Sequence, residues 1–387
     1  MANSINALIP YNWKSIVQDF LNNKLVAKAI CNTDFRDVLS SGSRVYWPQL
    51  ATLVSQAYTP GSSITSTPVT AAESYLDNDQ SRVVSFYMNP QEEAQAKASY
   101  TMKMAQQAAF VIADEMDKKV LATGINAAGA TVSGGTIDSS HIYGVFTSAR
   151  TKLSRKNAID GELFAVVDPE REALLSQMQV ADGFTLADRS LTNEYAGYTN
   201  GFKVYVSNNL PCSNTLTLDT NPTADDTLTI MGVTFKFVAN GTAANAGEIS
   251  LGANIGATQP IVVNAINGTG TPGASAYIEV SAEDRRLLTN NQVTASDFAA
   301  NATTITATGR LDGAETFTAA TNIFGTETTA LLFGRIGSIA LGMQMLPELY
   351  IREEENGIGK FYHTHTLYGT KVFSRDVNRL VKVTCNA

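Results

Sequence analysis

The longest helical pattern in the chain lies between residues 90 and 122. Asn89 is a favourable N-cap, Pro90 suits the first helical position, and Glu92 lies three residues after the cap. Gly124 follows as a stop signal. At about 1.5 Å per residue the predicted helix would be roughly 50 Å long. Its apolar or small residues recur at helical spacing: Ala94, Ala98, Met102, Ala105, Ala109, Ile112, Met116 and Val120.

A second amphipathic pattern occupies residues 12–30. Trp13, Ile16 and Phe20 fall at positions i, i+3 and i+7, which predicts a short helix with one apolar face. The polar sequence NTDFRDVLSSGS follows, so little in the neighbouring sequence can cover that face. The helix either docks on its own domain or forms an arm that packs on a neighbour.

Two strand-like segments are separated by an unusually long connection. RVYWPQL (44–50) and RVVSFYM (82–88) are rich in residues that favour strands. Between them lie roughly thirty residues rich in Thr, Ser, Ala and Pro, against two to five in an ordinary hairpin loop. The pattern predicts a projecting arm, which needs a surface outside its own domain to lie on.

The segments after the long helix alternate between helix and strand patterns. HIYGVFTSARTKLSRK and EREALLSQM predict helices, whereas ELFAVVDP (162–169) and GFKVYVSNNLP (201–211) predict strands. This mixture indicates a layered domain of both helices and strands. Near the C-terminus, GRIGSIALGMQMLPELYI predicts a helix leading into strands, and HTHTLYGTKVF alternates as a strand does.

The composition changes at about Cys212. The 119 residues from there to Ala330 contain 23 Thr and no Trp. TLTI and VTFKFVA flank Met231-Gly232 and predict a hairpin, and TQPIVVNAING predicts a short helix. We expect a small, mainly β domain inserted into the larger one.

The net charge of −8 is concentrated in this inserted segment, which carries 11 acidic and 4 basic residues. The rest of the chain has 25 acidic and 24 basic residues, which argues against a protein whose main task is to grip nucleic acid. One basic cluster stands out, and a solvated helix end or a subunit contact is favoured there over a nucleic-acid patch: Arg150, Lys152, Arg155 and Lys156.

The sequence shows no pattern for a membrane span, a secretory signal or a disulfide framework. No segment approaches the ~20 apolar residues that span a bilayer, and MANSINALIP has no basic residue before an apolar stretch, so no secretory signal is predicted. Cys31, Cys212 and Cys385 are widely spaced, which fits a reducing cytoplasm without a disulfide framework or zinc site.

Candidate chemistry is sparse. His363 and His365 would share one face of a strand and could ligate a metal, but no third ligand cluster lies nearby in sequence. The GTGTPG segment (268–273) matches G-x-G-x-x-G, yet it contains a Pro and lacks a preceding strand. We therefore predict no catalytic residue, no cofactor and no metal. A metal-dependent hydrolase using the two histidines is the best enzymatic alternative.

The order of these parts resembles that of tailed-phage major capsid proteins, especially the P22-type coat protein. ALIPYNWKSIVQDFLNNKLVAKAICNTDF resembles their N-terminal segment, in which Pro10 and Trp13 fill a Pro-x-x-Trp opening. Gly42 and Arg44–Pro48 then enter the first strand of a long loop. The long helix, NGFKVYVSNNLP and the closing YGTKVF also match, so the resemblance covers about residues 5–211 and 326–387.

The resemblance implies the Hong Kong 97 phage capsid fold, an α+β fold shared with herpesvirus shells and encapsulins. The implied parts are an N-terminal arm (1–39), an extended β loop (40–89), a peripheral domain with a long spine helix (90–140), an axial domain (141–211), an inserted mainly-β domain (212–325), and the rest of the axial domain with peripheral-domain strands (326–387).

The same resemblance implies a major capsid protein that self-assembles, as pentamers and hexamers, into an icosahedral shell around double-stranded DNA. The expected location is the virion capsid, after synthesis in the host bacterial cytoplasm, with no membrane partner. A separate scaffolding protein is expected, because no charged, coiled-coil-like segment precedes the arm. A portal and optionally a decoration protein complete the expected partners. An encapsulin-like shell and, from the Thr-rich insertion, a tail or adhesin subunit are the alternatives.

We expect the contacts between subunits to involve the arm, the loop and charged residues near the C-terminus. A solvated turn is the favoured interpretation of the acidic trio at 353–355, and the alternative is a contact with Arg375 and Arg379 of an adjacent subunit. The hypothetical contact residues are Trp13, Ile16, Phe20, Arg44, Arg82, Glu353, Glu354, Glu355, Arg375 and Arg379.

Overall fold

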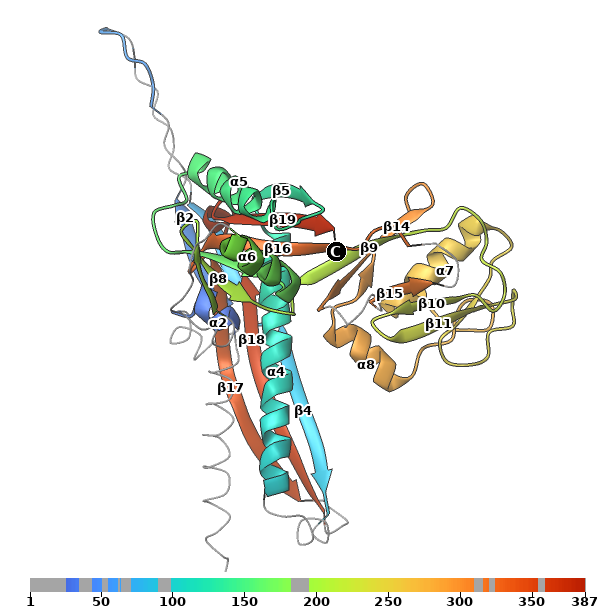
Figure 1. The fold of residues 1–387 in the computed structure, drawn as a ribbon. Coiled ribbons are helices and arrows are strands. Elements are labelled where there is room, and N and C mark those ends of the chain that lie inside the picture. Colours follow the sequence, from blue (N-terminus) through green and yellow to red (C-terminus); the bar gives the residue numbers. More distant parts are fainter. Residues whose placement is uncertain are drawn as a thin grey trace, which may run out of the picture. The chain divides into compact units, whose positions relative to one another are not determined.

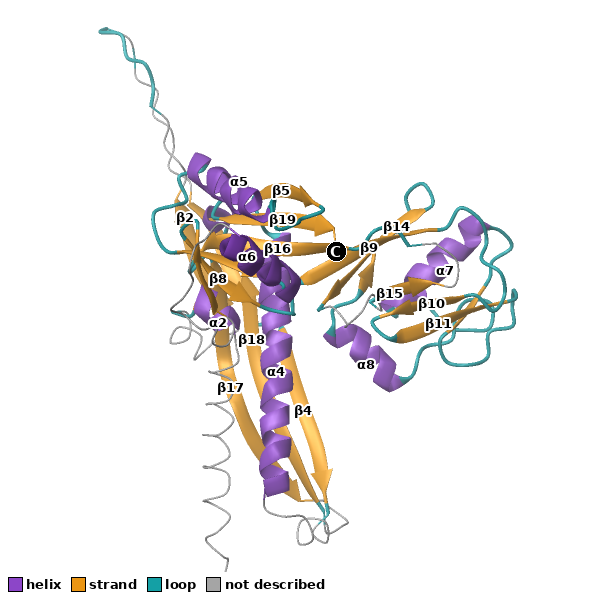
Figure 2. Cartoon of the chain, viewed as in Figure 1, coloured by secondary structure: helices purple, strands orange, loops and turns teal. Residues whose placement is uncertain are grey.

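The computed structural model describes residues 26–34, 44–50, 55–61, 63, 71–89, 99–181, 195–309, 316–319, 324–353 and 359–386 (Figures 1 and 2). The chain divides into two compact units. The first unit comprises residues 1–113 and 336–377, and the second comprises residues 114–335 and 378–387. None of the described helices combines the length and apolarity needed to cross a membrane.

The first unit is built on a four-stranded sheet in the order β1 (Cys31–Asn32), β17 (Ile339–Glu353), β18 (Lys360–Lys371) and β4 (Gln80–Met88). β17, β18 and β4 are antiparallel neighbours, whereas β1 pairs with β17 in parallel beside the short helix α2 (Val26–Ile30). Side chains of β18 alternate between buried and half-buried, so one face of this sheet is covered and the other is open.

The helix predicted from residue 334 onward is wrong, because this stretch forms two strands. β16 (Thr328–Arg335) ends in the second unit, and β17 begins at Ile339 in the first. Gly337 has φ +83° between them, a left-handed conformation that breaks a helix. Both strands have partners distant in sequence, and that pairing overrides the local pattern.

Residues 44–77 contain a two-stranded antiparallel ribbon. β2 (Arg44–Leu50) confirms the predicted strand, and its antiparallel partner is β3 (Ala71–Asp77). The second predicted strand, at 82–88, is β4. A small apolar cluster anchors the ribbon to the rest of the first unit: Val45, Leu76, Ala340 and Phe373.

The long helix α4 (Ser99–Asn126) confirms the strongest sequence pattern. Its 28 residues correspond to about 40 Å. The predicted stop at Gly124 is wrong, because the helix continues to Asn126 with Gly124 buried. A Gly inside a helix costs only about 1 kcal/mol, which the burial of neighbouring Leu121 and Ile125 offsets. The predicted N-cap region at 90–98 lies outside the described residues.

The second unit contains a nine-stranded sheet. Its main path begins with β13 (Thr294–Ala295), β14 (Ala302–Thr308) and β9 (Pro211–Thr217), continues through β16, β6 and β8, and ends at β7, with β19 and β5 joined beside β16. The helices predicted around residues 141–156 and 170–178 are confirmed as α5 (Ile142–Arg155) and α6 (Pro169–Ala181). The predicted strands are confirmed as β6 (Leu163–Val167), buried along its whole length, and β8 (Phe202–Val206). The remaining central strands are β5 (Ala130–Gly135), β7 (Tyr195–Thr199) and β19 (Leu380–Asn386).

Three aromatic rings form the centre of this part of the second unit. Phe146 of α5, Phe202 of β8 and Phe333 of β16 meet edge to face, with centroids 5.0 to 6.0 Å apart. All three side chains are fully buried. Such aromatic pairs add about 0.5–1.5 kcal/mol each beyond area burial, so they fix α5 on the sheet.

The inserted segment has a hydrophobic core of its own, whose fully buried members all lie between Cys212 and Phe317. The predicted hairpin is confirmed, with a turn at Met231 and Gly232 in which both residues have positive φ. The segment's elements are β9 (Pro211–Thr217), β10 (Thr227–Ile230), β11 (Val233–Val238), β12 (Glu248–Ser250), α7 (Ile255–Asn267), α8 (Ala282–Asn290), β13 (Thr294–Ala295), β14 (Ala302–Thr308) and β15 (Phe317–Ala319).

Candidate assembly and binding surfaces

The two histidines of the H-x-H motif lie on β18, on the open face of the sheet. His365 Nε2 and Ser81 Oγ are 3.0 Å apart, and the His363 ring stacks on Phe361 with centroids 6.0 Å apart. Within the described ranges, no group of three or more His, Cys, Asp or Glu residues is placed to hold a metal ion. The hydrolase alternative therefore gains no support there.

Large apolar side chains surround these histidines on the same open face. Val83 and Tyr87 of β4 and Tyr350 of β17 are between 45% and 57% exposed. Tyr87 packs against Phe361 across the strands, with ring centroids 4.9 Å apart. A face that exposes several large apolar groups together is typical of a protein-contact surface.

Arg44 and Arg82, predicted as contact residues of the extended loop, lie on β2 and on β4 respectively. Arg44 Nε is 2.6 Å from Asp77 Oδ1, and its guanidinium lies 4.6 Å from the centre of the Tyr75 ring. Lys371 approaches the same ring at 4.7 Å and donates to the Tyr75 carbonyl. Arg82 Nη2 is 3.5 Å from Gln80 Oε1. Arg44 thus takes part in holding β2 on β3 within its own chain.

The charged residues predicted near the C-terminus are only partly described. Glu353 ends β17 opposite Lys360 of β18. Arg375 is exposed and lies 3.5 Å from Asp376, while the Arg379 carbonyl accepts from the Arg335 amide. Their pairing between subunits stays a prediction, and five predicted residues lie outside the described ranges: Trp13, Ile16, Phe20, Glu354 and Glu355.

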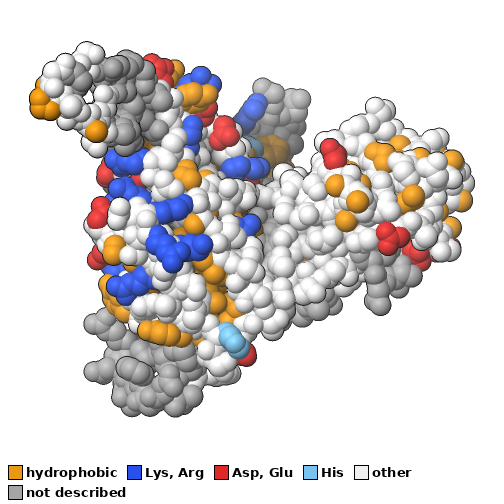
Figure 3. Space-filling view, turned by 90° about the horizontal axis from the view of Figure 1, so that it is seen from above, with side chains coloured by type: hydrophobic (Ala, Val, Ile, Leu, Met, Phe, Trp, Pro, Cys, Tyr) orange, Lys and Arg blue, Asp and Glu red, His pale blue; other side chains and the backbone are white. Residues whose placement is uncertain are grey.

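The basic cluster singled out in the sequence lies on and just after α5. Figure 3 shows blue side chains gathered over this helix. Its buried face is apolar, so its polar side chains point outward. Arg150 Nη1 donates to the backbone oxygen and to Oδ1 of Asn200, at 2.8 and 3.1 Å. Lys156 donates to the Gly129 carbonyl and to Asn378 Oδ1.

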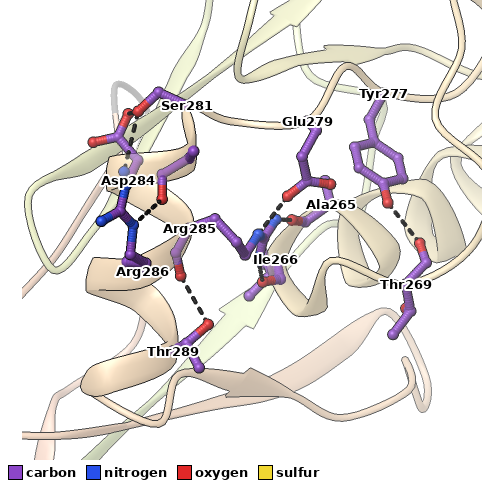
Figure 4. Close-up of polar contacts among 11 residues, drawn as sticks. Ala265, Ile266, Thr269, Tyr277, Glu279, Ser281, Asp284, Arg285, Arg286 and Thr289 are labelled. Atoms are coloured by element: carbon purple, nitrogen blue, oxygen red, sulfur yellow. Dashed lines mark hydrogen bonds and ion pairs between the residues drawn. The ribbon is translucent and has the colours of Figure 1, made fainter. Parts of the chain in front are cut away.

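The inserted segment contains a polar cluster centred on Arg285 (Figure 4). Arg285 donates from Nη1 to the Ile266 carbonyl and from Nη2 to the Ala265 carbonyl, both at 2.7 Å, and its Nε pairs with Glu279. These carbonyls belong to the last turn of α7, which lacks intrahelical donors for them. Arg285 therefore fastens α8 to the end of α7, which is a structural role.

Local sequence signals existed for part of this cluster. The Ser281 hydroxyl accepts from the Asp284 amide at the start of α8, an N-cap pattern visible in SAED that the sequence reasoning overlooked. Arg285 contacts the carbonyls of Ala265 and Ile266, which lie about 20 residues earlier in the sequence. No local sequence pattern indicates a contact between residues so far apart.

Solved structures of other proteins share the fold of this chain. No protein-family model and no curated protein matches the sequence. A solved structure from Mycobacterium phage Che8 matches with a TM-score of 0.55 at 11% identity, covering 93% of this chain and 91% of that chain. One from Microbacterium phage Oxtober96 matches with a TM-score of 0.50 at 11% identity, covering 94% and 91%.

A capsid structure of the cyanophage P-SCSP1u is also similar, with a TM-score of 0.47 at 12% identity, covering 94% of this chain and 88% of that chain. Identities this low bear on the fold alone. Since the likeness to the Che8 and Oxtober96 phage proteins extends over more than nine-tenths of the chain, this chain shares their α+β fold, the Hong Kong 97 fold.

Proposed function

We propose that this chain is the major capsid protein of a tailed double-stranded DNA phage, and that many copies close into an icosahedral shell. The observation that carries the proposal is the fold match, which includes 93% of this chain and 91% of the Che8 phage chain.

The parts of the chain have clear counterparts in such a shell. In this proposal β2 and β3 form the base of the extended loop, α4 is the spine helix, and the β17–β18–β4 sheet belongs to the peripheral domain. The β6–β8–β16 region with α5 and α6 forms the axial domain. Residues 212–325 are an inserted domain on the outer surface, supported by their separate apolar core and their acidic charge.

In the same proposal, two parts of the chain would contact neighbouring subunits when the shell closes. The open face of the β17–β18–β4 sheet, with exposed Val83, Tyr87 and Tyr350, would be covered by a neighbouring subunit. The N-terminal segment 1–35 would serve as an assembly arm because Trp13, Ile16 and Phe20 are costly to expose. A separate scaffolding protein and a portal would guide closure, and the packaged DNA would be held without sequence-specific binding.

Sedimentation velocity tests this function directly. The purified chain, alone and co-expressed with the genes that neighbour it, should form particles of megadalton mass in at least one condition. A small oligomer of fixed size in every condition would contradict the proposal. Double-stranded DNA inside particles made during infection would separate a phage shell from a compartment shell that encloses protein.

A further inference from the structure

The exposed surface of α5 has an unusual chemical composition for this acidic protein. The helix IYGVFTSARTKLSR contains no Asp or Glu, and its exposed polar side chains are all cations or hydroxyls. Figure 3 shows the resulting concentration of blue side chains. The exposed polar residues are Thr147, Ser148, Arg150, Thr151, Lys152, Ser154 and Arg155.

The chain itself does not neutralise these cations within the described ranges. The partners of Arg150 and Lys156 are carbonyl and amide oxygens, which carry no net charge. Lys152 and Arg155 are exposed in the last turn. A positive potential therefore remains over the outer surface of α5.

The carboxylates in the adjoining segments have other partners. Asp138, just before α5, accepts from Ser140 and His141, which holds its pKa well below the usual range. Beyond the helix, the Asp160 carboxylate lies 3.1 Å from Arg335 Nη1 and the Glu162 carboxylate lies 2.6 Å from Lys203 Nζ. These acids are engaged close to α5 without pairing with its cations.

The helix dipole alone does not account for this composition. Cations in the last turn of a helix are stabilising, typically by 0.3–1 kcal/mol, which gives Lys152 and Arg155 a modest local role. The effect fades beyond that turn, so it does not explain Arg150 or the absence of acids along the whole helix. A solvated helix would ordinarily carry charges of both signs.

We infer that the exposed face of α5 binds the phosphate backbone of duplex DNA, an inference that rests on the proposed function. Lys, Arg, Ser and Thr are the side chains that most often donate to phosphate oxygens. Such contacts carry no sequence information, as suits a surface that meets any packaged genome. Each subunit would contribute a few weak, salt-sensitive contacts, and the shell would repeat them many times.

A protein partner fits this surface less well. Protein interfaces rely on large apolar or aromatic anchors at their centre, surrounded by a polar rim. The exposed side of α5 offers one such group, Tyr143, which is 48% exposed. Its other exposed side chains are small hydroxyls and long cations, which match a polyanion better than a packed protein surface.

The test uses a double variant of the full chain, Lys152→Gln with Arg155→Gln. The matched control, Lys236→Gln with Arg286→Gln, removes the same charge from the inserted segment, where Lys236 pairs with Asp225. Fluorescence anisotropy would report binding to a random-sequence duplex of about 20 base pairs across a salt series, at concentrations that keep the chain unassembled. Circular dichroism would verify that both variants fold.

Two lost phosphate contacts should lower the slope of log affinity against log salt by about 2, and weaken binding at low salt by about tenfold or more. The control should stay within about twofold of the native chain. Equal loss in both variants, or no loss in either, would overturn the inference. Sedimentation velocity of the same proteins under assembly conditions would report particle formation. Unchanged DNA binding with impaired particle formation would also overturn the inference, because α5 would then be a subunit contact. Failure of every variant and the native chain to form particles under those conditions would instead count against the proposed function.

Discussion

At the scale of single residues, a buried arginine secures the C-terminal strand. Arg171 is 4% exposed, and its Nη1 donates to Asp168 Oδ2 at 2.6 Å and to Glu170 Oε2 at 2.8 Å. Its Nη2 donates to the backbone carbonyl of Asn386, at the end of β19. Next to this group lies the thiol of Cys385, which donates to the Thr329 carbonyl. Burial raises the pKa of this thiol to about 11.

This environment predicts an unreactive thiol. In the native chain at pH 8, Cys385 should resist alkylation by iodoacetamide, since both its burial and its high pKa suppress the thiolate. Buried Cys212 should resist as well, whereas both should be labelled in denaturant. Peptide mass spectrometry after timed labelling measures this. Fast native labelling of Cys385 would show that β19 is open to solvent.

Glu248 gives a pH dependence to the inserted segment. Its carboxylate accepts from the backbone amides of Ala244 and Asn245 and from Asn245 Nδ2, at 2.8 to 2.9 Å, which lowers its pKa to about 2. Because the folded pKa lies below the ordinary value of 4.5, the stabilisation is complete above pH 4.5 and is lost as the pH falls through about 2.

The Glu248→Gln variant tests this contribution. It should melt at a lower temperature than the native chain at pH 7, and the difference should shrink as the pH approaches 2, where the native carboxylate is also protonated. Differential scanning calorimetry from pH 7 to pH 2.5 follows the difference. If the difference in melting temperature between the two proteins did not depend on pH, the effect of the substitution would come from packing and not from the charge of Glu248.

At the scale of elements, Arg285 joins α8 to the end of α7 (Figure 4). In the Arg285→Ala variant, the carbonyls of Ala265 and Ile266 lose their donors, and Glu279 loses its partner. We expect the free energy of unfolding of the inserted segment to fall by about 1–3 kcal/mol. Urea unfolding monitored by circular dichroism measures the change.

The neighbouring residue provides a matched control. Among the described residues, Arg286 on the same helix donates only within that helix, from Nε to the Ala282 carbonyl, so Arg286→Ala should change the free energy of unfolding by at most about 0.5 kcal/mol. If both substitutions lowered the free energy of unfolding equally, the decrease would come from removing a positive charge from α8 and not from losing the contacts of Arg285 with α7.

The elements that could be predicted are those whose stability depends on local pattern. α5, β6, β8, the β10–β11 hairpin and α7 follow from periodicity, caps and turn residues. β3 and β17 could not be found in this way, because partners far along the chain decide them: β3 pairs with β2, and β17 pairs with β18. α8 could have been found from the Ser281 cap.

The candidate surfaces, like the elements, were predictable only where local sequence determines them. The cations of α5 are evident in the sequence, but their exposure and their uncharged partners depend on how Asn200, Gly129 and Asn378 are placed by the fold. The open apolar face beside His363 arises only when β4, β18 and β17 are aligned side by side. Sequence reasoning can propose such groups, yet the register between strands determines which of them meet.

At the scale of the whole molecule, the inserted segment should be dispensable for the rest of the fold. Among the described residues, the members of its buried apolar cluster all lie between Cys212 and Phe317, and β9 pairs with β16 only at Cys212–Thr329 and Ser213–Thr328. Replacing residues 212–325 with a short Gly/Ser linker should leave a soluble, folded chain, as judged by circular dichroism and particle formation. An insoluble product would show that the two parts fold together; a folded product that fails to assemble would place subunit contacts in the insertion.

The segment proposed as an extended loop (40–89) would also limit how subunits can be joined. No Lys occurs between Lys28 and Lys97, so the loop lacks the amine needed for an isopeptide bond, and the guanidiniums of Arg44 and Arg82 stay protonated. Particles boiled in detergent should therefore give one band near 41.4 kDa on a denaturing gel. A ladder of multimers that survives reducing agent would contradict this.

Electron cryomicroscopy of the assembled chain would show whether it builds a phage shell. We expect closed icosahedral shells in which the open face of the β17–β18–β4 sheet of each subunit is covered by a neighbouring subunit. A small oligomer in all conditions, or a shell whose subunits leave that face in solvent, would contradict this expectation.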